Sequence, residues 1–223
     1  PRVMDIESLT ERVHGLTQGN PFYVKSFLDY LHEFGLLHFD SISSCWSWNF
    51  TDDDTPNDIV DIFVRRLHNF SESSQLMISL AACLGNVFRL KDLSTISDHS
   101  FEECLTILTP LLDKRLIASV NKGESERRPH EQSSSDWFAF MHDRVQQAAF
   151  QLISNENIRT VHLKIGRQLL DEMTEEELDL NLFKILEYLN FGSKLIDAEF
   201  EQKRMVELNM LAAGKAKAAT AFG

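Results

Sequence analysis

The sequence has no long apolar run, few cysteines and no spacing typical of metal ligands. No window of its 223 residues approaches the roughly 18 consecutive apolar residues that a membrane-spanning helix needs, so we expect no membrane contact. A basic start followed by an apolar stretch, the pattern of a signal peptide, is also missing. Of three cysteines, Cys83 and Cys104 lie in apolar helical patterns. This predicts free buried thiols in a reducing, cytoplasmic compartment.

Basic residues are scarce relative to acidic ones. Lysine and arginine number 22 against 34 aspartates and glutamates, which gives a net charge of −12. This balance repels polyphosphate backbones and predicts no nucleic-acid partner, although it does not exclude a small nucleotide in a local pocket. The sequence also contains no Gly-x-x-x-x-Gly-Lys-Ser/Thr loop and no apolar strand that ends in paired acidic residues. We therefore expect no catalytic residue and no metal site in this chain.

The first third of the chain predicts helices separated by glycine and proline signals. Apolar residues recur at helical spacing until Gly19. Glycine adopts the left-handed backbone conformation that ends a helix at little cost in free energy. Asn20 then suits the N-terminal cap of a second helix, and Pro21 suits its first turn. Two short alternating runs predict a β-hairpin. A third helix follows, and we expect its two arginines, Arg65 and Arg66, at the surface.

The middle third has the element order of a winged helix, three helices followed by a two-stranded hairpin. Ser71 begins a helix that runs to Leu84, and a short helix follows. Ser100 and Glu103 then form a capping box that starts the third helix. Two strands flank a polar insert, residues 121–136, which we expect to be mobile. Because the third helix carries more acidic than basic residues, we interpret the winged helix as a packing module rather than a DNA reader.

A histidine stands where the last predicted strand gives way to a helix. Residues 137–140 alternate as a strand does, and His142 follows immediately before an amphipathic helix. An imidazole at such a junction can point out of the packed layer while its backbone stays fixed. It donates hydrogen bonds and titrates near neutral pH, which favours a side chain that reads a charged ligand. The alternative is a polar residue that begins a surface helix.

The rest of the chain reads as helical throughout. Thr174 and Glu177 form a second capping box, and the last segment is rich in alanine, which permits close approach between helices. The predicted fold class is mainly α with short β-hairpins. The predicted domains are a helical lid (residues 1–70), a winged helix (71–153) and the start of an α-helical, TPR-like repeat region (154–223).

Five short motifs occur together and in a fixed order. They lie at residues 19–24, 46–48, 81–88, 140–149 and 162–167. The combination resembles the ATPase module of the STAND class, signal-transduction NTPases with numerous domains. It is most similar to the version inside large multidomain sensor kinases, between a protein-kinase-like domain and a GAF–histidine kinase region. The resemblance covers nearly the whole chain and implies a piece of a longer protein, downstream of a P-loop core.

The resemblance implies roles for two of these motifs. Gly19, Asn20 and Pro21 match a Gly-x-Pro element whose proline packs against the adenine of the bound nucleotide. His142 matches the histidine of a Met-His-Asp element that contacts the β-phosphate of ADP in related switches. The implied cofactor is ATP or ADP, with Mg²⁺ bound by residues outside this chain. An ordinary helix cap is the alternative for the first motif.

These implications lead to one functional hypothesis and two alternatives. The hypothesis is a non-catalytic regulatory segment of an ATP/ADP-dependent switch in a sensor kinase, histidine or Ser/Thr, of a two-component phosphorelay. Its expected partners are the upstream P-loop core, the attached kinase domains and a protein bound to the helical repeats. One alternative is a winged-helix transcription regulator. The other is a helical scaffold without nucleotide contact, which would be favoured if residues 19–21 and 142 lay far apart.

Overall fold

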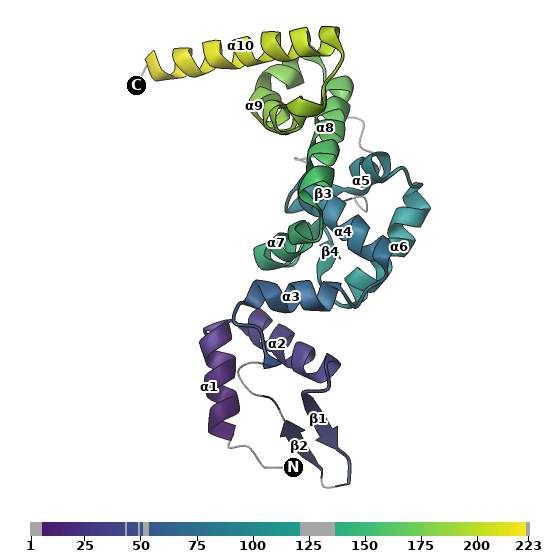
Figure 1. Ribbon diagram of the computed structural model, residues 1–223, viewed down its shortest axis with the longest axis vertical. Coiled ribbons are helices and arrows are strands. Elements are labelled where there is room, and N and C mark those ends of the chain that lie inside the picture. The colour runs from purple at the N-terminus through teal and green to yellow at the C-terminus, as the bar shows by residue number, and fades with distance from the viewer. Residues whose placement is uncertain (1–5, 43, 49, 51–53, 121–136, 222–223) are drawn as a thin grey trace.

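The protein is an elongated, mainly helical molecule in which three groups of elements are stacked along the long axis (Figure 1). The computed structural model describes residues 6–42, 44–48, 50, 54–120 and 137–221. The predicted fold class, mainly α with short antiparallel strands, is confirmed. The polar insert predicted to be mobile, residues 121–136, lies outside the described residues.

The N-terminal group contains three helices and one hairpin. Its elements are α1 (Ile6–Thr17), α2 (Pro21–Glu33), β1 (Leu37–Asp40), β2 (Cys45–Trp48) and α3 (Ile59–Leu67). The strands pair antiparallel, with Leu37 opposite Trp48, as the alternating runs predict. One expectation was wrong. Arg66 is buried rather than exposed, because the acidic residues at the end of α2 neutralise its guanidinium.

The middle group packs four helices against a three-stranded sheet. Its elements are α4 (Glu72–Leu84), β3 (Val87–Arg89), α5 (Leu90–Ser97), α6 (Phe101–Asp113), β4 (Ile117–Ser119), β5 (Trp137–Phe140) and α7 (Asp143–Gln151). The strand order β3-β5-β4 places β5 in the centre. The sequence predicted only two of these strands. β3 has three residues and one buried side chain, Phe88, so it is too short to alternate visibly.

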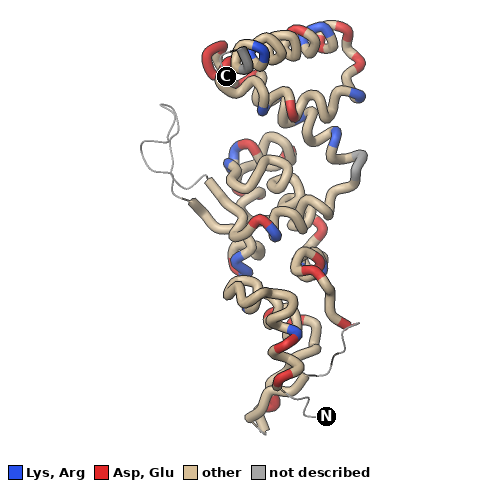
Figure 2. Tube along the Cα trace, turned by 90° about the vertical axis from the view of Figure 1, so that its left-hand side faces the viewer, with Lys and Arg blue, Asp and Glu red and all other residues tan. Residues whose placement is uncertain are grey.

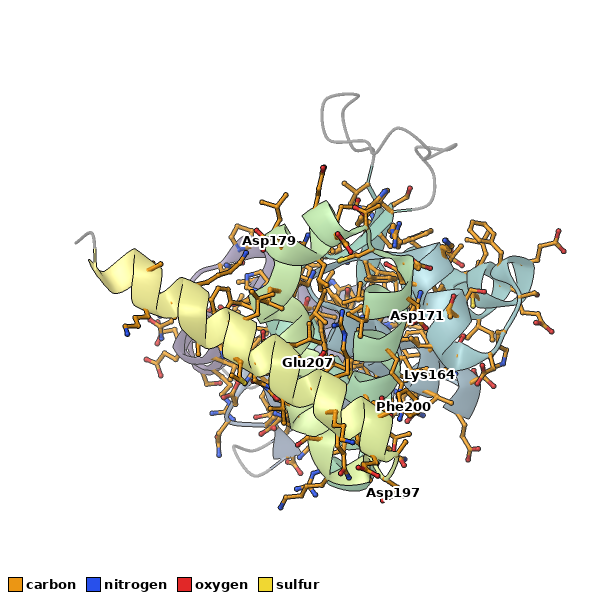
Figure 3. All side chains as sticks on the ribbon, turned by 90° about the horizontal axis from the view of Figure 1, so that it is seen from above. Lys164, Asp171, Asp179, Asp197, Phe200 and Glu207 are labelled. Carbon is orange, nitrogen blue, oxygen red and sulfur yellow. The ribbon has the colours of Figure 1, made fainter. Side chains whose placement is uncertain are left out.

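The C-terminal group consists of three long helices and a short 3-10 turn. Its elements are α8 (Asn155–Glu172), α9 (Glu175–Gly192), η4 (Ser193–Leu195) and α10 (Glu199–Ala221). α10 crosses obliquely above α8 and α9, with Phe200 and Glu207 on its outer surface (Figure 3). Two ion pairs fix this crossing: Arg167 with Glu201 at 2.6 Å and Lys215 with Asp179 at 2.5 Å.

Two hydrophobic clusters hold the three groups together. The larger one runs without interruption from α2 through α3, α4 and α7 into α8. The smaller one joins α8, α9 and α10. α8 belongs to both, because Ile165 lies in the first cluster and Leu163 in the second. α3 packs chiefly against α7 and less extensively against α2, so its apolar face joins the N-terminal and middle groups.

The described thiols and helices agree with the composition. Cys83 and Cys104 are free and buried, as predicted, and burial raises the pKa of the Cys83 thiol to about 12. Cys45 is free and exposed. Within the described ranges, none of the helices is both long and apolar enough to cross a membrane.

α8 and α9 touch at two glycines, and this contact generates a stability prediction. A Cβ atom on Gly192 would lie 2.6 Å from Leu163 Cβ and 2.9 Å from the Arg159 carbonyl oxygen. Backbone atoms cannot move aside cheaply, so Gly192→Ala should destabilise the chain by about 1–3 kcal/mol through overpacking. Thermal unfolding followed by circular dichroism measures this effect.

Gly214 provides the matched control for this prediction. It lies in α10, and a Cβ atom there would meet nothing within 4 Å. Gly214→Ala should therefore raise stability by up to about 1 kcal/mol, since alanine is the better helix former. A Gly192→Ala variant as stable as the unaltered chain would show that the close approach of α8 and α9 is wrong.

Candidate functional site

A tight corner between α1 and α2 contains the first predicted site motif. Gln18 and Gly19 both adopt left-handed backbone angles, with φ of 51° and 75°, and they reverse the chain direction. Asn20 caps α2: its Oδ1 accepts the backbone N–H groups of Phe22 at 3.0 Å and Tyr23 at 3.4 Å. Pro21 is the first helical residue and has no N–H to satisfy. The first-turn N–H groups at this corner are therefore occupied by the Asn20 cap.

The end of β5 and the start of α7 position the second predicted residue. His142 has an extended backbone and is the N-cap of α7. The central place of β5 in the sheet fixes this backbone, because both neighbouring strands bond to it. The next residue, Asp143, accepts the Arg144 N–H at 2.8 Å. Asp143 thus caps the helix locally, as its position next to the histidine suggests.

The His142 ring rests on the first turn of α2. It stacks on Phe22 with 5.5 Å between ring centroids and 9° between ring planes. Tyr23 lies against its edge, with the hydroxyl 2.9 Å from Nδ1 and 3.0 Å from Nε2. These two residues directly follow Pro21. The structure therefore brings His142 to the helix that Pro21 begins, although no described contact joins it to Gly19, Asn20 or Pro21 themselves.

Proton positions at this contact depend on the histidine tautomer. Nδ1 lies beside both the Arg144 N–H, at 3.3 Å, and the Asp143 carboxylate. Burial and the negative charge of Asp143 raise the pKa of the Tyr23 hydroxyl, so this hydroxyl stays protonated near neutral pH. Tyr23 can then donate to the unprotonated imidazole nitrogen or accept from the protonated one. This hydrogen-bonded contact joins the start of α2 to the end of β5.

A charged cleft of about 620 Å³ runs along α2 from Phe22 to Glu33. A stripe of α2, the turn between α6 and β4, and Met141 line this cleft. Arg66 from α3 forms its central ion pairs. Arg66 donates to Glu33 at 3.0 Å and lies 4.0 Å from Asp29, and Lys114 reaches the same Glu33 at 2.8 Å. Glu33 therefore links α2 to both α3 and the end of α6.

The electrostatics of Glu33 follow from this arrangement. Burial alone would raise the pKa of the Glu33 carboxyl, but hydrogen bonds and positive charge from Lys114 and Arg66 hold it below its ordinary value of 4.5. The carboxylate is thus ionised at neutral pH and satisfies a guanidinium that is almost fully buried. Buried arginines require such a partner, since an unpaired buried charge is costly.

Sequence reasoning found the histidine but missed its contacts. Tyr23 and Phe22 belong to the same motif as Pro21, yet nothing in the spacing shows that they meet a ring 119 positions away. The Glu33 network was also missed, because Arg66 has the pattern of a surface arginine. Its position on the buried side of α3, in line with Ile59, Ile62 and Phe63, was the available signal.

The described residues offer little to a metal or a phosphate group. Within the described ranges, no group of three or more histidine, cysteine, aspartate or glutamate side chains could hold a metal ion. The corner at Asn20 has no free N–H to cradle an anion.

Comparison with known proteins gives one informative likeness. The chain is similar to "Hybrid signal transduction histidine kinase G" from Dictyostelium discoideum. The two are 28% identical over an alignment of 262 positions, which covers 96% of this chain and 8% of that protein. This chain therefore spans less than a tenth of the length of the curated relative it matches. No protein-family model and no solved structure matches it.

The Glu33 network generates a pH-dependent stability prediction. Glu33→Gln removes the carboxylate but keeps the shape, and it leaves Arg66 buried without its main partner. We expect a loss of roughly 1–3 kcal/mol near neutral pH, less than for a fully buried pair because Glu33 is partly exposed. A carboxyl whose folded pKa is depressed stabilises the fold above its unfolded pKa, and this contribution disappears as pH falls through the folded pKa.

The difference in unfolding free energy between Glu33→Gln and the unaltered chain should therefore shrink below the ordinary carboxyl pKa of 4.5. Urea titrations across this pH range measure it. Glu11→Gln, an exposed carboxylate on α1, should change stability little at any pH. A gap of constant size down to about pH 2 would contradict the role given to Glu33.

Proposed function

We propose that this chain is the regulatory segment of a nucleotide-dependent switch in a large multidomain sensor kinase. In this proposal residues 1–70 are a helical lid, 71–153 a winged helix and 154–223 the start of a helical repeat region of a STAND-class ATPase. The likeness to a hybrid histidine kinase over almost the whole chain supports the signalling context. The contact of His142 with Phe22 and Tyr23 is the main observation that supports the proposed switch.

The contact suits a sensor because the imidazole already bridges two parts of the molecule. It is anchored on the sheet by β5 and rests on the start of α2. A diphosphate beside Pro21 would offer oxygen acceptors to the same imidazole N–H that faces Tyr23. Competition for one donor then couples ligand occupancy to the position of α2 relative to the sheet. In this proposal the chain supplies His142, the side chain that contacts the phosphate, while the residues that bind the rest of the phosphate chain belong to other parts of the protein.

The packing suggests where such a switch would move. α3 is held chiefly by α7, so a moving lid would consist of α1, α2 and the hairpin, with the break between α2 and α3. The contacts that cross that break include the His142 stack on Phe22, the Phe22–Phe63 stack at 5.8 Å and the Glu33 ion pairs. Hydrogen bonds from Arg65 to Tyr30 and from Arg12 to Thr55 cross it as well, together with the larger hydrophobic cluster. A closure at this break would have to separate and remake all of these contacts.

The transcription-regulator alternative receives less support from the geometry. α6 would be the DNA-reading helix, yet its exposed start is acidic, with Glu102 and Glu103. Of the two cations after it, Lys114 is paired with Glu33. Basic residues of the described chain are scattered among acidic ones (Figure 2). A large separation of the two predicted motifs would have favoured the scaffold alternative, whereas His142 contacts the two residues that follow Pro21.

Two substitutions with opposite expected signs test the proposal in the intact multidomain protein. His142→Ala removes the reading imidazole and should accelerate release of a fluorescent ADP analogue about tenfold, the effect of one charge-assisted hydrogen bond. Tyr23→Phe keeps the ring contact but removes the competing hydroxyl, so it should slow release. Stopped-flow fluorescence measures both rates. His14→Ala, an exposed histidine of α1, is the matched control, and unchanged release by His142→Ala would refute the proposal.

The chain by itself should bind ATP no more tightly than the millimolar range. It carries no phosphate loop, and the N–H groups at the start of α2 are occupied by Asn20. Isothermal titration of ATP with Mg²⁺ into the 223-residue chain, together with a phosphate-release assay, checks this. Micromolar affinity with turnover would show that the catalytic machinery lies within these residues after all.

A further inference from the structure

A second, smaller cleft of about 120 Å³ lies where the three-stranded sheet meets α8 and α9. β3 and β5 provide one wall, and α8 and α9 provide the other. It shares no lining residue with the His142 contact, although Trp137 begins the strand that leads to His142. Its volume is close to the about 150 Å³ of an engineered apolar cavity that holds benzene. The cleft is therefore the right size for one small ring.

The walls of this cleft are mostly apolar. Phe88 and Ile165 form its buried surface, at 2% and 1% exposure. Leu169, Met173 and the Trp137 indole complete the lining. Apolar and aromatic walls with a few polar groups are the usual composition of small-molecule sites. An apolar ligand body would replace water against these side chains and gain the corresponding hydrophobic free energy.

The charged residues beside the indole are already neutralised. Arg89 lies over the Trp137 ring, with its guanidinium carbon 5.7 Å from the centroid. Asp92 accepts from this guanidinium at 2.6 Å and Glu172 lies at 3.5 Å. This group fixes the indole that lines the cleft. Lys91 also pairs with Glu172 at 3.2 Å, so two positive and two negative charges balance and the group does not demand an ionic ligand.

Some hydrogen-bond donors of α8 and α9 at this cleft already have acceptors within the protein, and others do not. Tyr188 donates to the Cys83 carbonyl at 3.2 Å, and the Asn181 amide donates to the Glu177 carbonyl at 2.8 Å. In the described part of the chain, neither the Lys184 ammonium nor the Gln168 amide has a partner. Two donors on facing helices therefore border an apolar cleft. Lys184 also supplies a positive charge that no described carboxylate pairs with.

We infer that this cleft binds a small organic acid with an apolar body, of about the size of benzoate. The ring would lie among Phe88, Ile165, Leu169 and Trp137, and the carboxylate would accept from Lys184 and Gln168. Such a ligand contacts the sheet and the C-terminal helices together. It would stiffen the joint between them and would give the chain an input site separate from any nucleotide.

Titration of sodium benzoate into the 223-residue chain, followed by NMR of the tryptophan indole N–H signals, tests this inference. We expect saturable binding that shifts the Trp137 signal, which a Trp137→Phe variant assigns. Lys184→Met keeps the aliphatic stem and should weaken benzoate binding about tenfold, while binding of uncharged benzyl alcohol stays unchanged. Lys194→Met, an exposed lysine in η4, should change neither ligand.

A cavity-filling variant distinguishes this cleft from other surfaces. Leu169→Trp should abolish binding of both benzoate and benzyl alcohol. If that variant does not fold, the Trp137 shift and the Lys184→Met comparison in folded protein decide the matter. Absence of saturable benzoate binding in the millimolar range would overturn the inference, as would equal benzoate affinity in Lys184→Met. None of these results depends on whether the longer protein binds a nucleotide.

Discussion

The contact of the His142 imidazole with the first turn of α2 joins the N-terminal and middle groups, beside the apolar face of α3 that packs on α7. Its geometry is fixed from both sides. β5 is bonded along both edges, so the backbone that leads to the histidine cannot shift without breaking the sheet. Asn20 fixes the start of α2 by capping its first N–H groups. The ring is therefore held between two elements whose backbones are both fixed.

The two ends of α2 are held by different physical forces. At the start of the helix, a stacked ring and the hydrogen bond between Tyr23 and His142 provide the contact. At its end, Glu33 joins Arg66 and Lys114 through charge. The first contact is sensitive to a competing acceptor and the second to ionic strength and acid. The two ends of the helix therefore respond to different changes in conditions.

Local features of the fold could be predicted from the sequence because each depends on neighbouring residues. The caps at Asn20, Ser100 and Thr174 stand where their residue types place them. β3 could not be predicted, since a strand of three residues is too short to show a pattern and is defined only by its pairing with β5. Burial of Arg66 was missed for a similar reason, because its partner Glu33 comes from another helix. The site followed the same division: His142 was visible in the sequence, whereas its partner Tyr23 emerged only from tertiary packing.

α8 has a mechanical consequence that follows from its double membership of the two hydrophobic clusters. It has 18 residues, which at 1.5 Å per residue is a rod about 27 Å long. Its lower part packs with the middle group (Figure 1), while Gly166 against Leu189 and Gly192 against Leu163 hold it close to α9. A tilt of a few degrees where the rod is rooted therefore becomes an ångström-scale displacement at its far tip. A protein bound to α9 or α10 would therefore be displaced as a whole by such a tilt, rather than by a local rearrangement of side chains.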